Sequence, residues 1–182
     1  MNDKTTHFGF RDVPVEDKKK LVGEVFSSVA TKYDVMNDLM SLGVHRLWKR
    51  YFTGMSGIKR GDRVLDLAGG TGDIAKLLLD RVGESGEIVI GDINKEMLSV
   101  GRDRLTDLGL LKGLSYVQLN AESLPFPDNS FDAITMAFGL RNVTDKLTAL
   151  KSMHRILKVG GKLMVLEFSE VQAEWFKPIY DF

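Results

Sequence analysis

The sequence predicts an α/β fold, with a helical cap followed by a doubly wound parallel sheet. From about residue 61 onward, short apolar runs alternate with amphipathic stretches, and glycines mark breaks between them. The chain before residue 58 has helical periodicity instead. Strands that alternate with helices favour a parallel sheet with helices on both faces.

The N-terminal part is expected to hold a polar tail and then helices. The tail covers roughly the first dozen residues and is expected to be irregular. Apolar residues at helical spacing between Glu16 and Phe52 indicate two or three helices. We therefore expect a tail and cap over residues 1–57 and a core over residues 58–182.

The core contains five expected strands and three expected helices. The strands are expected at residues 63–68, 87–91, 114–119, 131–138 and 162–168. The helices are expected at residues 73–81, 95–108 and 145–157. On the last helix, one apolar face is expected to comprise Leu147, Leu150, Met153 and Leu157. Gly160-Gly161 is expected to be the tight turn into the fifth strand.

Composition excludes several classes of function. The 25 basic and 25 acidic residues balance, which argues against a strongly basic nucleic-acid binder. The absence of cysteine excludes disulfides, thiolate metal sites and a cysteine nucleophile. No cluster has metal-ligand spacing, so no metal is expected. Without a signal peptide or an apolar run long enough to span a bilayer, a cytoplasmic protein is the default expectation.

A glycine-rich turn follows the first core strand and reads Asp66-Leu67-Ala68-Gly69-Gly70-Thr71-Gly72. Glycine lets the backbone turn sharply and lets a ligand approach closely. Asp92 ends the second strand, where a carboxylate can accept two hydrogen bonds from ribose hydroxyls. The turn and the acid together indicate a nucleoside-binding site, against the alternative of a plain tight turn and a surface aspartate.

The spacing of the glycines leaves two cofactor classes open. A dinucleotide motif, Gly-x-Gly-x-x-Gly, fits at Gly70 and Gly72 but has Ala75 at its last position, where alanine is tolerated. The turn more closely resembles the first motif of the class I S-adenosylmethionine-dependent methyltransferases, Asp-x-Gly-x-Gly-x-Gly, with Ala68 in place of the first glycine.

This resemblance implies a Rossmann-like core and a particular set of cofactor contacts. It places Asp66 near the amino-acid end of S-adenosylmethionine, and Asn120-Ala121-Glu122 beside the adenine. Taken alone, Asn120 and Glu122 fit an ordinary polar loop equally well. The expected cofactor-binding residues are Asp66, Gly70, Thr71, Asp92, Asn120 and Ala121.

Longer motifs narrow the family. The first comprises Tyr33-Asp34-Val35-Met36-Asn37, then Ser41, His45 and Trp48. The second runs from Arg155 to Lys162 and on to Glu167-Phe168-Ser169. Together they are similar to the signatures of the ubiquinone/menaquinone biosynthesis C-methyltransferases.

One residue departs from that family's pattern. Ala137 stands where the family often carries serine, in a segment that approaches the cofactor. A methyl group cannot donate the hydrogen bond that a serine hydroxyl would donate. We therefore expect a loss of about 1 kcal/mol in cofactor affinity at this position.

The resemblance implies methyl transfer from S-adenosylmethionine to a ring carbon of a prenylated quinol. That carbon becomes nucleophilic when a phenolic oxygen loses its proton, and phenols titrate at about pH 10. The site therefore needs a base or a positive group. The candidates are Arg141, His45 and Tyr33. Arg141 is favoured because it follows the fourth strand, against the equal alternative of a structural ion pair. Trp48 is expected to pack rather than to contact substrate.

Three other functions stay open. They are methylation of another small molecule or of RNA, cofactor binding without catalysis, and nicotinamide-dependent oxidation. A prenyl tail would bring the enzyme to the inner membrane transiently, and Lys18-Lys19-Lys20 could touch an anionic bilayer. The favoured alternative for these lysines is a solvated charge run.

The chain ends at Phe182, soon after the fifth expected strand. Class I methyltransferases usually continue with a helix and an antiparallel pair of strands beside that strand. We therefore expect a C-terminally incomplete sheet whose fifth strand is an edge. Unpaired apolar edges favour association, so a homo-oligomer and reduced activity are expected.

Overall fold

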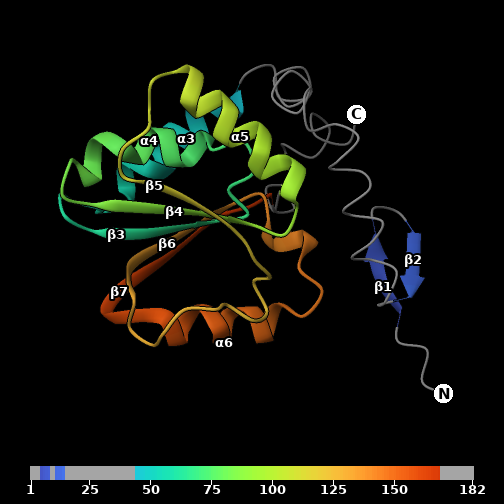
Figure 1. The fold of residues 1–182 in the computed structure, drawn as a ribbon. Coiled ribbons are helices and arrows are strands. Elements are labelled where there is room, and N and C mark those ends of the chain that lie inside the picture. The colour runs from blue at the N-terminus through green and yellow to red at the C-terminus, as the bar shows by residue number, and fades with distance from the viewer. Residues whose placement is uncertain (1–4, 9–10, 15–43, 169–182) are drawn as a thin grey trace, which may run out of the picture.

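In a computed structural model of the chain, a five-stranded parallel sheet lies between two layers of helices (Figure 1). The structure describes residues 5–8, 11–14 and 44–168. The strands are β3 (Arg63–Leu67), β4 (Glu87–Asp92), β5 (Leu114–Gln118), β6 (Phe131–Ala137) and β7 (Leu157–Leu166). Their order is β5-β4-β3-β6-β7, so the direction of winding reverses between β3 and β6. The doubly wound prediction is confirmed, and ligands in such sheets bind at this reversal.

Helices cover both faces of the sheet, as the alternation of elements predicted. The first face carries α3 (Val44–Met55), α4 (Asp73–Val82) and α5 (Lys95–Asp107), and the second carries α6 (Lys146–Ile156) (Figure 1). Successive strand side chains point to opposite faces, so β3 contributes Val64 to the first apolar cluster and Leu65 to the second. Burying each such side chain contributes about 1.5–3 kcal/mol.

Local sequence explains where two of these helices begin. The Asn94 side chain accepts a hydrogen bond from the backbone N–H of Met97 at 2.9 Å and caps α5. Asp145 caps α6 by accepting from the backbone N–H of Thr148 at 3.0 Å. Each cap satisfies an N–H that the helix itself leaves unpaired, which stabilises the first turn of the helix.

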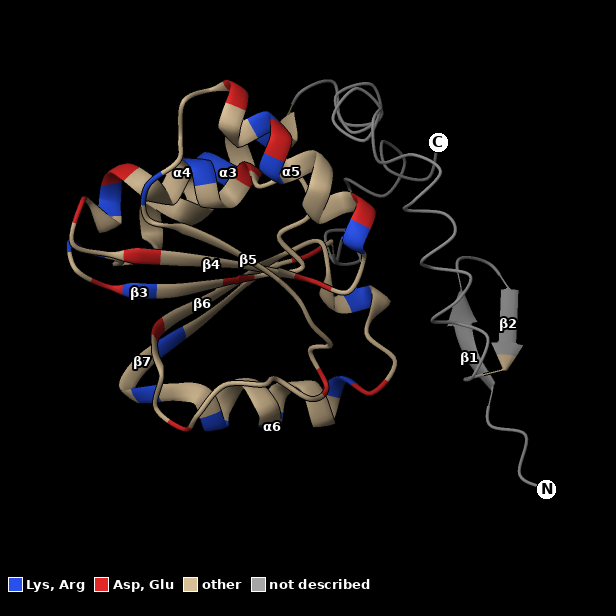
Figure 2. Cartoon of the chain, viewed as in Figure 1, with Lys and Arg blue, Asp and Glu red and all other residues tan. Residues whose placement is uncertain are grey.

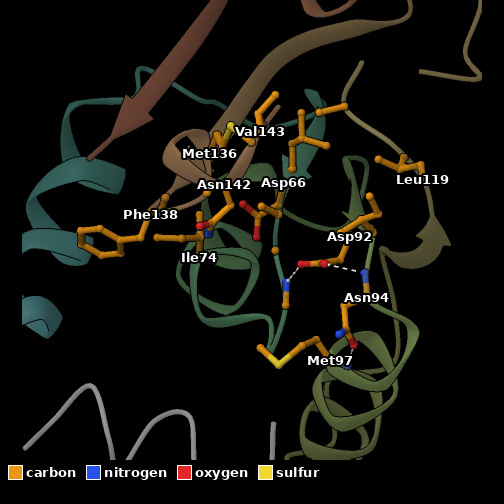
Figure 3. Close-up of a pocket in the computed structure, with 18 of the residues that line it drawn as sticks. Asp66, Ile74, Asp92, Asn94, Met97, Leu119, Met136, Phe138, Asn142 and Val143 are labelled. Atoms are coloured by element: carbon orange, nitrogen blue, oxygen red, sulfur yellow. Dashed lines mark hydrogen bonds between the residues drawn. The ribbon is translucent and has the colours of Figure 1, made fainter. Parts of the chain in front are cut away.

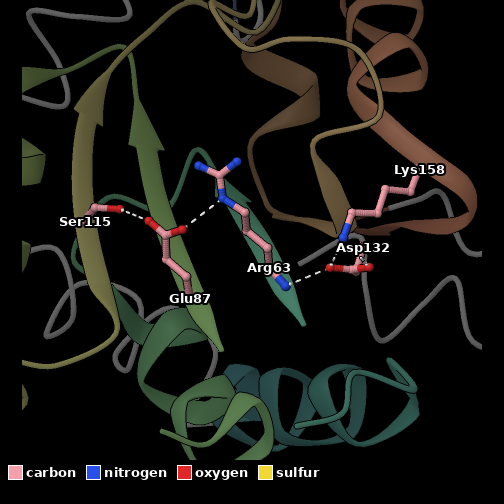
Figure 4. Close-up of polar contacts among 5 residues, drawn as sticks. All are labelled: Arg63, Glu87, Ser115, Asp132 and Lys158. Carbon is pink, nitrogen blue, oxygen red and sulfur yellow. Dashed lines mark hydrogen bonds and ion pairs between the residues drawn. The ribbon is translucent and has the colours of Figure 1, made fainter. Parts of the chain in front are cut away.

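One polar network links all five strands at their amino-terminal ends (Figure 4). Glu87 of β4 accepts from Ser115 of β5 at 3.0 Å and from Arg63 of β3 at 2.8 Å. Asp132 of β6 accepts from the Arg63 backbone N–H at 2.9 Å and from Lys158 of β7 at 2.8 Å. The network therefore follows the strand order of the sheet, at the end opposite the carboxyl ends of the strands.

Charged residues of both signs are spread over the described part of the chain (Figure 2). Helices α4 and α5 carry acidic and basic residues, whereas α3 and α6 carry basic residues only. This distribution matches the balanced composition of the chain. Among the described residues, no helix is both long and apolar enough to cross a membrane.

The buried face of α6 differs from the predicted one. Met153 is buried as predicted, but Leu147 and Leu150 are 63% and 37% exposed, so the prediction is wrong for these two residues. The fourth residue of the predicted face, Leu157, is the first residue of β7 and not part of the helix. The buried residues are Ala149, Met153 and Ile156, which recur four and three residues apart and form a continuous stripe. Ala149 belongs to the apolar cluster on this face of the sheet, and a search for leucine periodicity does not reveal such a small residue.

The predicted turn at Gly160-Gly161 lies inside β7. Phe131 pairs with Leu157, but Ala133 pairs with Lys162, so the intervening residues of β7 bulge out of register. Gly160 has a φ of 80°, which glycine adopts without a steric penalty. The sequence located this irregularity, but β7 begins before it. Within the described ranges β7 pairs only with β6, and Val159 on it is completely exposed.

The N-terminal residues contain strands where an irregular tail was expected. β1 (Thr5–Phe8) and β2 (Arg11–Pro14) pair antiparallel, so that prediction is wrong for these residues. Threonine, valine and phenylalanine favour strands. The expected cap helices before α3, Tyr33 and Lys18-Lys19-Lys20 lie outside the described residues. The division at residues 57 and 58 stays a prediction.

Candidate active site

A pocket opens at the carboxyl ends of β3, β4 and β6, where the winding of the sheet reverses (Figure 3). Its lining comes from the segments that follow β3, β4, β5 and β6, together with Lys49 of α3. The lining includes all six residues predicted to contact the cofactor, which are Asp66, Gly70, Thr71, Asp92, Asn120 and Ala121. The structure therefore brings these residues together around one cavity.

Asp92 fixes the glycine turn at the pocket. Its Oδ2 accepts the backbone N–H of Gly70 at 2.9 Å, and its Oδ1 accepts that of Asn94 at 2.9 Å (Figure 3). Burial raises the pKa of this carboxyl, although the backbone N–H donors lower it in part. A carboxylate has about four lone-pair sites, so Asp92 retains acceptor capacity for two hydroxyl groups.

Gly70 leaves room for a ligand beside Asp92. Its φ is 46°, in the left-handed region. A Cβ at this position would lie 3.1 Å from Cε of Met97 and 3.7 Å from Oδ2 of Asp92. Any larger residue would therefore fill the space in front of the carboxylate.

Asp66 is the most deeply buried acid of the pocket, with 1% of its surface exposed. Its Oδ1 accepts the Thr135 hydroxyl at 2.9 Å, and its Oδ2 accepts the backbone N–H of Ala75 at 3.2 Å. Burial raises its pKa to about 7, since these two donors and Lys49 offset only part of the desolvation. Asp66 therefore changes charge near neutral pH.

The raised pKa predicts a pH-dependent cost in stability. Unfolding returns the Asp66 pKa toward 3.8, so the cost is absent below that pH, grows with pH and is complete above about 7. Asp66→Asn cannot ionise and keeps the size of the side chain. From pH 5 to pH 8, the free energy of unfolding of the variant minus that of the original protein should rise by on the order of 3 kcal/mol. Urea denaturation at both pH values measures this difference. The exposed Asp103→Asn variant should show no such pH-dependent gain. If Asp66→Asn behaved like this control, the assigned pKa would be wrong.

An ion cluster joins three helices beside the glycine turn. Asp73, the first residue of α4, accepts from Lys49 of α3 and from Arg104 of α5, each at 2.6 Å. Burial raises the pKa of Asp73, but the two cations outweigh it and the pKa lies below its usual value. The cluster therefore carries two positive charges and one negative charge.

Two residues without glycine's freedom occupy the left-handed region at the pocket. Ala68 has a φ of 55° and Phe138 a φ of 57°. Ala68 stands where the class I motif has glycine. The left-handed backbone at this position explains why the motif prefers glycine there. The conformation of Ala68 costs about 1–2 kcal/mol. A Cβ at Gly139 would lie 2.5 Å from the Cβ of Ala68, so the two positions cannot both carry a side chain without a shift.

This contact predicts a compensating pair of substitutions. Gly139→Ala should lower the free energy of unfolding by about 1–3 kcal/mol, because its methyl group overlaps that of Ala68. Ala68→Gly should raise it by about 1 kcal/mol through relief of the backbone strain. In the double variant most of the loss should disappear. Chemical denaturation of all four proteins gives the coupling energy, and strictly additive effects would contradict the contact.

The structure separates the catalytic candidates from the cofactor pocket. Arg141 lies in the short helix η2 (Leu140–Asn142) and forms an ion pair with Glu167. Its guanidinium lies 5.4 Å from the ring centre of Phe168. His45 is buried in α3, with 5% of its surface exposed. Neither residue lines the pocket, and Tyr33 lies outside the described residues. Their catalytic roles stay predictions.

An aromatic cluster forms one wall near the pocket. The Phe168 ring stacks on Phe138 with centroids 4.7 Å apart, and Trp48 meets Phe168 edge to face at 5.8 Å. Phe138 also lines the pocket, as does Ala137. Trp48 thus packs against an aromatic ring, as expected for it.

Sequence reasoning missed two residues at this site. Lys49 lies on the buried face of α3, one turn after His45, and that spacing was the available signal. Gly101 lies inside α5, where an isolated glycine usually has a packing reason. A Cβ on Gly101 would lie 2.5 Å from the carbonyl oxygen of Gly70. In the described ranges, no group of His, Asp and Glu side chains could hold a metal ion.

The fold and the site together define a class I S-adenosylmethionine-dependent methyltransferase. The pocket combines the glycine turn after β3, an acid at the end of β4 and the Asn120-Ala121 segment after β5. Residues 13–182 match the ubiE/COQ5 methyltransferase family, and the chain belongs to this family. Its methyl donor is S-adenosylmethionine.

Individual relatives agree with this assignment. The chain is 72% identical over 178 residues to the ubiquinone/menaquinone biosynthesis C-methyltransferase UbiE of Xanthomonas oryzae pv. oryzae, covering 98% of this chain and 70% of that protein. It is 70% identical to UbiE of Xylella fastidiosa strain M12, with the same coverage. A crystal structure of a SAM-dependent methyltransferase from Aquifex aeolicus superposes with a TM-score of 0.66 at 27% identity, covering 81% of this chain and 76% of that one.

Proposed function

We propose that this chain transfers the methyl group of S-adenosylmethionine to a ring carbon of a prenylated quinol in ubiquinone or menaquinone biosynthesis. The observation that carries the proposal is the high identity to the UbiE enzymes across nearly the whole chain. The aromatic wall of Trp48, Phe138 and Phe168 beside the pocket supports it, because a flat, apolar ring packs well against such side chains.

The residues of the pocket fit the methyl donor. Asp92 would accept hydrogen bonds from the ribose hydroxyls, and the backbone at Gly70 allows close approach to that carboxylate. Asn120 and Ala121 would flank the adenine. Asp66 and Thr71 would lie near the amino-acid end of the donor, and the buried Asp66 would favour its ammonium group.

When bound, S-adenosylmethionine supplies an electrophilic methyl group on its sulfonium. The chain's own contribution is to hold the quinol carbon in line with that group and to exclude water. Phe138 is suited to orient the ring, because it lines the pocket and is held by stacking on Phe168. The quinol must also be deprotonated, for which Arg141, His45 and Tyr33 remain the candidates.

Arg141 is the favoured candidate, and its ion pair with Glu167 supplies a test. Stabilising a phenolate requires the guanidinium itself, whereas a structural role requires only the pair. Arg141→Ala should lose most turnover with donor affinity intact, while Glu167→Gln, which breaks the pair but keeps the cation, should retain turnover. Equal losses in both variants would assign Arg141 a structural role.

A turnover assay tests the proposal as a whole. The chain is incubated with S-adenosylmethionine and a short-chain prenylated quinol, and the product is analysed by mass spectrometry for a new carbon-bound methyl group. If the chain binds the donor but does not methylate the quinol, the proposal is wrong, and the remaining functions are methylation of another small molecule or cofactor binding without catalysis. Binding of NAD in place of S-adenosylmethionine would contradict the cofactor class.

A further inference from the structure

Charge is distributed unevenly around the pocket. Four acidic residues line it, which are Asp66, Asp73, Asp92 and Glu122. Among the lining residues of the described chain, Lys49 is the only lysine or arginine. A ligand with a sulfonium and an ammonium group suits the acids, but its carboxylate needs a cation.

Lys49 is placed unusually for a lysine. It lies on the buried face of α3 with His45 and Phe52, and 8% of its surface is exposed. Lysine is rarely buried to this extent without a partner, since desolvating its charge is costly. The partner within the described residues is Asp73, at 2.6 Å. The ammonium has three N–H donors, and this contact uses one.

Asp73 does not need Lys49 for neutralisation. Its other carboxylate oxygen accepts from Arg104 at 2.6 Å, so one cation remains matched to it if Lys49 is replaced. Of these three residues, Lys49 and Asp73 line the pocket and Arg104 does not. The Lys49 ammonium is therefore the cation of this cluster that can reach a ligand in the pocket.

The geometry points to Lys49 as the residue that binds the α-carboxylate of S-adenosylmethionine. The inference rests on the proposed placement of the donor, whose amino-acid end lies beside Asp66 and the glycine turn. Asp73 follows that turn directly and holds the Lys49 ammonium at this end of the pocket. Asp66 favours the ammonium of the donor and Lys49 its carboxylate, so the two residues distinguish the two ends of a zwitterion.

Three ligands isolate the carboxylate. S-adenosylmethionine has it, decarboxylated S-adenosylmethionine lacks it, and methylthioadenosine lacks the whole amino-acid end. In isothermal titration the original protein should prefer S-adenosylmethionine over its decarboxylated form by about ten- to a hundredfold. Lys49→Met should lose that preference and bind methylthioadenosine as before, and Lys49→Arg should keep most of the preference. No preference in the original protein would overturn the inference without any variant.

Arg104→Met is the matched control. It removes the other cation from Asp73 and the hydrogen bond to the Thr71 carbonyl, but Arg104 itself does not line the pocket. Any loss of affinity should therefore be common to the three ligands, and the preference for the carboxylate should persist. If Lys49 only held the turn through Asp73, Lys49→Met would weaken all three ligands by the same factor, and the inference would be wrong. If the original protein binds none of the three adenosyl ligands, the proposed placement of the donor fails instead. Unfolding curves confirm that each variant is folded.

Discussion

Asp92→Ala is expected to lower the affinity for S-adenosylmethionine by about two to four orders of magnitude. Two charge-assisted hydrogen bonds to the ribose are lost, each worth about 1.5–3 kcal/mol. The structure adds a second cause, because the same carboxylate holds the backbone N–H groups of Gly70 and Asn94 at 2.9 Å. Without it the glycine turn loses its tether to the end of β4.

Asp92→Asn separates these two causes. An amide keeps one oxygen for a backbone N–H but presents an NH₂ group where the second acceptor was. Its affinity should fall between those of the original protein and of Asp92→Ala. Titration with S-adenosylmethionine measures both variants, and Asp103→Ala on the exposed side of α5 serves as the control. An unchanged dissociation constant for Asp92→Ala would remove Asp92 from the ribose site.

The cofactor side of the site could be predicted because its signals are local. Asp66 is the last but one residue of β3 and Asp92 the last residue of β4, and the carboxyl ends of such adjacent parallel strands meet at one edge of the sheet. The turn between β3 and α4 could be predicted from its glycines, and Gly70 and Gly72 do adopt a positive φ there. Whether a segment forms a helix or a strand could also be predicted, because the periodicity of its apolar residues is a local signal.

Contacts between distant parts of the chain could not be predicted in this way. The pairing of Arg141 with Glu167 depends on β6 and β7 lying side by side, and the cluster around Asp73 depends on three helices converging. A sequence shows that a charge is present but not which opposite charge it meets. The prediction that Leu147 is buried was wrong for a related reason, because the sheet against which a helix packs determines which face of the helix is buried.

The glycine at position 101 shows how a close contact can dominate a local preference. In an exposed helix interior, alanine is more stable than glycine by about 1 kcal/mol. In α5, however, a Cβ on Gly101 would lie 2.5 Å from the Gly70 carbonyl oxygen and 3.2 Å from Cα of Thr71. Both neighbours are backbone atoms of the cofactor turn, so neither can rotate away.

Gly101→Ala is therefore expected to lower the free energy of unfolding by about 1–3 kcal/mol, against its helix propensity. It should also lower S-adenosylmethionine affinity at least about tenfold, because the helix and the turn must separate and the turn that contacts the donor moves. Thr106→Ala, an exposed substitution on the same helix, should change neither quantity beyond about 0.5 kcal/mol. Urea denaturation and titration with the donor measure the two effects. A more stable Gly101→Ala variant with unchanged affinity would show that α5 does not hold the turn in place.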